Sequence, residues 1–272
     1  MPRLDCHSPL LDPIEILLRK IGRKTLYSNP LAYAREWPRD QGTTPFHALC
    51  AGRRPSGLTS ESVDLQHDKL GDFLAHMAHL EAAGVVAFER LAIELRAHGA
   101  PEELIEQALT AAEDERRHAD SLSALARARG GQPVEVQTLP FAVRSVLELA
   151  LENAVEGCIR ETYGALVGAH QATRARDLDV RLAMRTIAPE EARHAALAHG
   201  VHTWSLTRLN ADERDAVRRA QVSAVFTLAR ECALPPDPEV MEQAGLPDSG
   251  MACALLGELA RELWSPSSQH AA

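Results

Sequence analysis

The chain has 272 residues, of which 45% are apolar and 4% aromatic, and its formal net charge is -9. A chain of this length can bury a sizeable core, and its wealth of Ala and Leu with few β-branched runs indicates an all-α fold. The acidic balance argues against a nucleic-acid partner, and five widely spaced cysteines without a C-x-x-C pair argue against a zinc or thiolate-bound iron site.

The sequence also argues against a membrane or secreted location. No run of 18 or more apolar residues occurs, so we expect no membrane-spanning helix. The apolar residues near the N-terminus are interrupted by Asp12, Pro13 and Glu15, whereas a signal peptide needs a continuous apolar stretch. Scattered single cysteines suit a reducing compartment, and we therefore expect a cytoplasmic protein.

Long helical patterns begin near residue 66, after an N-terminal extension over residues 1–65 that we expect to be partly irregular. Gly99 and Pro101 mark the end of one helix and the start of the next, because Gly caps helix C-termini and Pro suits the first helical turn. Asp177 is a predicted N-cap, and Asn210 opens a predicted capping box. The expected helices span about 66–97, 101–129, 140–173, 177–208, 210–232 and 251–264.

The first four expected helices form two hairpins, over residues 66–130 and 140–208, which look like an internal repeat. Each hairpin has a short turn, and the link over residues 132–139 is long enough to cross from one hairpin to the other, as in some four-helix bundles. We therefore expect a four-helix bundle over residues 66–208, with further helices within residues 209–272 packing on it.

Each hairpin carries the same pattern of metal-binding residue types. One Glu is followed 34 or 35 residues later by a Glu-x-x-His pair. The Glu-x-x-His pairs alone are close to chance in a chain this rich in Glu, but the two preceding carboxylates complete the set that two adjacent metal ions take inside a bundle. The candidate metal ligands are Glu81, Glu115, His118, Glu156, Glu191 and His194.

Three features favour a single site for these six residues. They lie in apolar helical stripes, where a charged carboxylate is costly unless it is paired or binds a metal. At 1.5 Å per residue, the four carboxylates fall within roughly 5 Å of one height above the hairpin turns. Four carboxylates also balance the charge of two divalent cations, and oxygen ligands with one imidazole per metal suit iron or manganese.

The segments Asp114–Ala119 and Glu190–Ala195, with Glu81 and Glu156, resemble the ferritin-like di-iron carboxylate proteins, such as bacterioferritins, rubrerythrins and the small subunit of ribonucleotide reductase. The resemblance covers about residues 66–208. It implies a ferritin-like bundle in which Glu115 and Glu191 bridge two metals, while each metal also receives one terminal Glu and one His. It further implies that the acids Asp114 and Glu190 hydrogen-bond the histidines.

This resemblance implies two Fe ions, with Mn or a mixed Mn/Fe pair as alternatives, and a non-haem oxidase or oxygenase that uses dioxygen or peroxide. It also implies a small-molecule substrate and an electron donor, and the terminal helices could support a homo-oligomer. The alternatives are a ferroxidase or peroxide scavenger, an iron-binding protein, and a metal-free structural bundle. One departure from the family pattern is Pro189, which should kink or bulge the fourth helix beside Glu191.

The sequence also predicts the positions and contacts of several residues near the candidate ligands. Glu161 lies about 140° around an α-helix from Glu156, so we expect it on the surface. Glu152 is expected to form a salt bridge near the mouth of the site, and Arg117 an ordinary surface pair with Glu113. Gly84 and Gly157 lie at the level of the ligands, where they allow either close helix packing or room for dioxygen or a small substrate.

Overall fold

The computed structural model describes residues 53–59 and 68–264, and those residues are predominantly helical. Most of the expected N-terminal extension, including residues 1–52, lies outside the described residues. An isolated β-bridge joins Leu58 to Thr138. The helices are α2 (Lys69–Ala97), α3 (Glu102–Ala128), α4 (Val146–Glu152), η3 (Asn153–Glu161), α5 (Thr162–Arg174), α6 (Leu178–Leu206), α7 (Ala211–Cys232), α8 (Pro238–Ala244) and α9 (Ser249–Glu262).

Side-chain caps define most of the helix starts. Asp177 caps α6 through the Val180 amide, and Asn210 forms a capping box with Glu213 at the start of α7, as predicted. The third of the expected helices begins at Val146 rather than near residue 140, because Ser145 forms a capping box that fixes the first turn there. The segment after residue 234, expected to be only a break, contains the short helix α8, which has Pro at its first turn.

Helices α4, η3 and α5 form one continuous rod with a π-helical segment in its centre. In η3 the backbone hydrogen bonds span five residues instead of four, so five residues make roughly one turn. Positions 156 and 161 therefore lie closer in angle around the rod than in an α-helix, which would separate them by about 140°, and position 161 turns toward the other hairpin.

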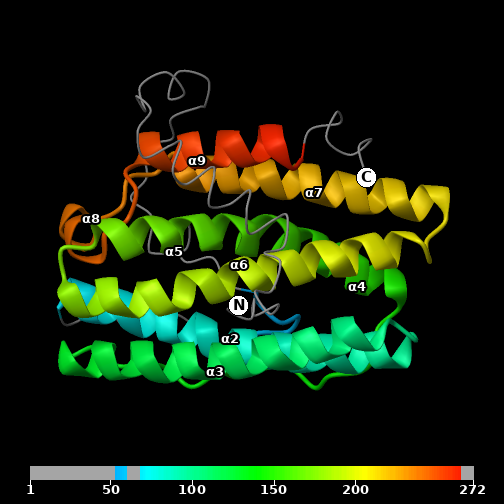
Figure 1. Ribbon diagram of the computed structural model, residues 1–272, viewed down its shortest axis with the longest axis horizontal. Coiled ribbons are helices and arrows are strands. Elements are labelled where there is room, and N and C mark those ends of the chain that lie inside the picture. Colours follow the sequence, from blue (N-terminus) through cyan, green and yellow to red (C-terminus); the bar gives the residue numbers. More distant parts are fainter. Residues whose placement is uncertain (1–52, 60–67, 265–272) are drawn as a thin grey trace, which may run out of the picture.

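The described helices pack as two antiparallel hairpins with the last helices on one side (Figure 1). Helices α2 and α3 form one hairpin, and the rod of α4, η3 and α5 forms the other with α6. Helices α7 and α9 pack on the second hairpin, while α8 contacts α2. None of the described helices is long and apolar enough to cross a membrane.

The link between the hairpins runs along α2 from one end to the other. Gly131 contacts Gly71 at the start of α2, and the Arg144 carbonyl lies 2.7 Å from His98 Nε2 just beyond its end. The chain thus returns along the length of the bundle before the second hairpin begins. This crossover lets the two hairpins pack side by side and brings α3 against α6.

Candidate metal centre

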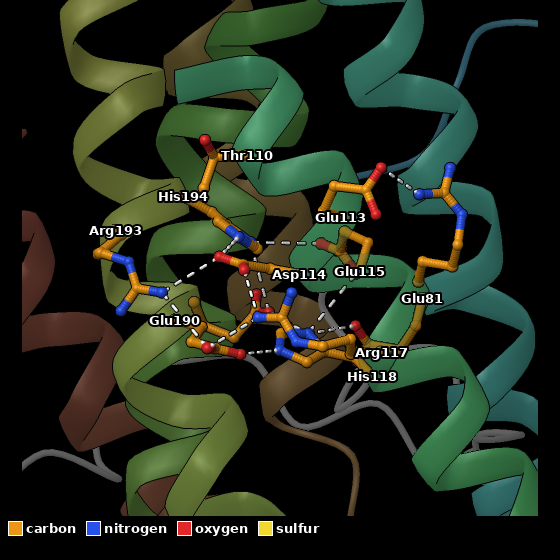
Figure 2. Close-up of polar contacts among 12 residues, drawn as sticks. Glu81, Thr110, Glu113, Asp114, Glu115, Arg117, His118, Glu190, Arg193 and His194 are labelled. Atoms are coloured by element: carbon orange, nitrogen blue, oxygen red, sulfur yellow. Dashed lines mark hydrogen bonds and ion pairs between the residues drawn. The ribbon is translucent and has the colours of Figure 1, made fainter. Parts of the chain in front are cut away.

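A buried cluster of carboxylates and imidazoles lies between the helices at mid-height. The acidic and imidazole side chains converge from α2, α3, η3 and α6, and Figure 2 shows those from α2, α3 and α6 pointing toward one another. Two groups in this cluster have ligand atoms that all lie within 4.8 Å of one another. One group is Glu81, Glu115, His118 and Glu191, and the other is Glu115, Glu161 and His194.

The imidazole Nδ1 atoms face the carboxylates. His118 Nδ1 lies 3.3 Å from a Glu81 oxygen and 3.2 Å from a Glu191 oxygen. His194 Nδ1 lies 3.3 Å from a Glu115 oxygen and 3.5 Å from Glu191. Glu115 also lies 3.9 Å from His118 Nδ1, so Glu115 and Glu191 each approach both histidines, as a carboxylate shared by two metals would.

The opposite nitrogen of each ring is held by an acid from the other hairpin. His118 Nε2 lies 2.7 Å from Glu190, and His194 Nε2 lies 3.4 Å from Asp114. The acids next to the two motif glutamates thus contact histidines, and each reaches across to the other motif. A carboxylate on Nε2 favours the tautomer that leaves Nδ1 free as a metal ligand.

Two arginines hold these acids in place. Arg117 donates to Glu190 at 3.0 Å and also pairs with Asp114, while Arg193 lies 3.2 Å from Asp114 (Figure 2). The prediction that Arg117 pairs with Glu113 is wrong, because Arg117 of α3 contacts Asp114 and reaches Glu190 on α6 instead. Arg116 forms the surface pair with Glu113, at 2.7 Å.

The polar atoms facing the centre of the cluster lack hydrogen-bond partners. Buried polar atoms normally have one, and leaving them without a partner costs about 1–3 kcal/mol each. Here the unsatisfied atoms belong to neighbouring side chains and point at one another, which fits a site that binds cations. They are Glu115 Oε1, His118 Nδ1, both carboxylate oxygens of Glu161, Glu191 Oε1 and His194 Nδ1.

Burial and mutual repulsion raise the pKa values of two acids in the cluster. Burial raises the pKa of Glu115 well above its usual range, and the nearby charges of Glu81 and Glu191 raise it further. Burial also raises the pKa of Glu161 to about 8, although the Arg53 charge opposes this rise. Both carboxyl groups therefore hold protons at neutral pH unless another cation takes their place.

The pKa values of the histidines are also raised, but by neighbouring carboxylates and against the effect of burial. Burial opposes the charge on His118, but its contacts with Glu191 and Glu81 dominate and raise its pKa to about 11. Burial likewise opposes the charge on His194, yet Glu191 and Asp114 raise its pKa well above the ordinary value. Protonated imidazoles thus supply positive charge at the positions where metal ions would otherwise supply it.

The structure places Glu161, not Glu156, in the cluster. The expectation that Glu161 lies on the surface is wrong, because its side chain is buried and belongs to the group with Glu115 and His194. Glu156 joins neither group; it accepts from the Arg54 amide at 3.4 Å and lies 3.9 Å from Arg160. The cause is the π-helical pitch of η3, which turns position 161 toward the ligand face.

The sequence also makes predictions for four other residues near the cluster: Glu152, Pro189, Gly84 and Gly157. Glu152 forms the predicted salt bridge, with Arg144 at 2.5 Å. Pro189 lies inside α6, which is α-helical throughout its length, so the bulge predicted beside Glu191 is not found there. Gly84 allows close approach of a side chain, since a Cβ there would lie 2.8 Å from the Glu115 carboxylate carbon. At Gly157, a Cβ would lie 2.9 Å from Arg53 Nη1.

Five of the six ligand candidates from the sequence therefore meet in one cluster. Glu161 was missed because helical periodicity carries no signal for a π-helix, although Gly157 in the centre of η3 is compatible with one. Comparison with known proteins adds no assignment: no family model, no curated protein and no solved structure matches this chain.

Proposed function

We propose that this protein is a ferritin-like di-metal carboxylate protein that acts as an oxidoreductase. The observation that carries the proposal is the set of buried ligand atoms that face one another without hydrogen-bond partners. In a metal-free structural bundle these groups would be compensated only by protons on the buried carboxyls and imidazoles, and apolar residues would avoid the cost of burying them.

The residues that would hold the metals divide into two sets that share carboxylates. Glu81 and His118 would serve one metal, and Glu161 and His194 the other. Glu115 and Glu191 would contribute to both, because each approaches both imidazoles. The four carboxylates balance two divalent cations, and oxygen ligands with one imidazole per metal favour iron, or manganese, over a thiolate-seeking ion.

Two bound iron ions would supply redox equivalents and Lewis acidity toward dioxygen or peroxide. The protein contributes a buried, preorganised environment. Asp114 and Glu190 orient the imidazoles, and the Phe88 ring packs 5.0 Å from the His194 ring, where it excludes water. An electron donor and, for an oxygenase, a small organic substrate belong to the same proposal.

Metal analysis of the purified protein is the direct test. We expect about two iron or manganese ions per chain in the wild type and clear loss of both in Glu115→Ala and His194→Ala, because each removal leaves an incomplete ligand set. Glu113→Ala is the matched control: Glu113 is adjacent on α3 but 68% exposed, and its variant should keep the wild-type metal content. Unchanged metal in the two ligand variants, or none in the wild type, would contradict the proposal.

Metal binding should release protons at neutral pH. Glu115, Glu161, His118 and His194 all have raised pKa values without metal, to about 8 for Glu161 and about 11 for His118. Metal ions must displace these protons, so we expect net release of protons at pH 7 and an affinity that rises with pH. Calorimetric titration in buffers of different ionisation enthalpy measures the number of protons released, and a pH-independent affinity would refute this expectation.

A further inference from the structure

Arg53 and Arg54 contact the first part of the π-helical segment η3, over residues 153–157. Arg53 Nη1 donates to Asn153 Oδ1 at 3.0 Å, at the first residue of η3. The same Nη1 occupies the space beside Gly157, in the middle of η3, where any Cβ would clash with it. The Arg54 amide contacts Glu156 at 3.4 Å.

Arg53 is an unusual residue for a core position. Its side chain is only 1% exposed, its guanidinium carbon lies 5.6 Å from the centre of the Phe88 ring, and its Nε atom has no hydrogen-bond partner. Burial of a guanidinium costs several kcal/mol, so a purely structural position would favour an apolar side chain. The packing of Phe88 against His194 places Arg53 next to the metal cluster.

The rest of the segment over residues 53–59 is fixed, so Arg53 enters the bundle in a defined position. Gly57 and Thr59 pair with the crossover link through backbone hydrogen bonds of 2.8 and 2.9 Å. Arg90 of α2 donates to the Ser56 carbonyl at 2.8 Å. The segment is thus fastened to α2 and to the link, independently of η3.

We propose that Arg53 is a positioning residue that holds η3 in its π-helical form and thereby makes Glu161, instead of Glu156, the fourth carboxylate of the metal centre. The proposal rests on the di-metal function proposed above. A π-helix is rare and has poorer backbone geometry than an α-helix, so it persists where other contacts favour it. Arg53 supplies such contacts at the start and in the middle of η3.

Loss of Arg53 should let the rod return toward an α-helical pitch. Asn153 Oδ1 would then lose the Arg53 donor, and one of the three groups that crowd Gly157 would be removed, while Ala198 Cβ and Asn153 Oδ1 would stay beside it. With 3.6 residues per turn, Glu156 and Glu161 would lie about 140° apart, and Glu156 would take the ligand position that α-helical periodicity predicts for it.

The experiment compares which carboxylate the metal centre requires, with and without Arg53. Iron content is measured for Glu161→Ala and Glu156→Ala, each in the wild-type chain and in Arg53→Met, an apolar replacement of similar length. With Arg53 present, we expect Glu161→Ala to lose at least half of the bound iron and Glu156→Ala to keep it. In the Arg53→Met background we expect the reverse: Glu156→Ala should lose the bound iron and Glu161→Ala should keep it. Arg53→Lys keeps a hydrogen-bond donor, so in that background iron binding should again require Glu161.

Arg54→Ala is the matched control, because it removes the neighbouring guanidinium but keeps the backbone amide that contacts Glu156. It should leave the requirement for Glu161 unchanged. Should Arg53→Met fail to fold, Asn153→Ala removes the same hydrogen bond from the η3 side and should give the same reversal. If iron binding requires Glu161 both with and without Arg53, the role of Arg53 is wrong but the di-metal function stands. If the wild type binds no metal, the di-metal function itself is wrong.

Discussion

Replacement of Gly84 by Ala is expected to abolish metal binding, although residue 84 supplies no ligand atom. An added Cβ would lie 2.8 Å from the Glu115 carboxylate carbon and 3.0 Å from one of its oxygens. Glu115 is buried and belongs to both metal-binding groups, so its displacement affects both metals at once. Displacement of a ligand's support typically costs 10–100-fold in metal affinity, and displacement of the shared ligand should cost at least that much.

The measurement is iron content after dialysis against a weak chelator, with circular dichroism to confirm that the helices form. Gly168→Ala is the matched control, since a Cβ there meets the Ala188 Cβ at 3.4 Å, an ordinary contact. That variant should bind iron normally and gain slightly in stability, because Ala favours a helix over Gly by up to about 1 kcal/mol. Normal iron content in Gly84→Ala would show that Glu115 is not the shared ligand.

Replacement of Arg144 by Leu should destabilise the protein by about 3–5 kcal/mol, because it leaves a buried carboxylate without its partner. Glu94 on α2 is fully buried, and Arg144 provides its counter-charge through side-chain contacts of 2.7 Å to both oxygens. The Arg144 amide also donates to Glu94 at 3.0 Å. Arg144 further pairs with Glu152, so its loss would also remove a side-chain connection between α2 and α4.

Urea unfolding of the metal-free protein measures this effect. The double variant Glu94→Leu with Arg144→Leu should recover most of the lost stability, because removing both charges avoids the unpaired carboxylate. Arg96→Ala serves as the surface control: Arg96 is also on α2, but it is 56% exposed and lies 3.9 Å from Glu102, so it should change stability by less than about 1 kcal/mol. A loss in Arg144→Leu no greater than in the control would refute a structural role for this pair.

Local patterns in the sequence predict most of the described helices and five residues of the buried carboxylate–imidazole cluster. Asp177 and Asn210 mark helix starts correctly, because capping is a local interaction between residues three positions apart. Glu115 and His118 face the same cluster for a similarly local reason, since residues three apart on an α-helix are neighbours.

Interactions between distant segments account for what the sequence does not reveal. The choice between Glu156 and Glu161 depends on the pitch of η3, and that pitch depends on contacts from outside the rod. Likewise, the contact of Arg144 with the buried Glu94 joins residues that lie 50 positions apart. Neither pairing leaves a periodic signal in the sequence.

The crossed contacts of Glu190 with His118 and of Asp114 with His194 make the two hairpins mutually dependent. Neither hairpin can orient its own histidine, since the acid that does so belongs to the other. A change in the spacing between α3 and α6 would therefore alter both histidines together, and the two metal positions would be gained or lost as a pair. In a chain with two similar halves, such reciprocity ties the halves to each other, so that a substitution of the acid in one motif acts on the histidine of the other.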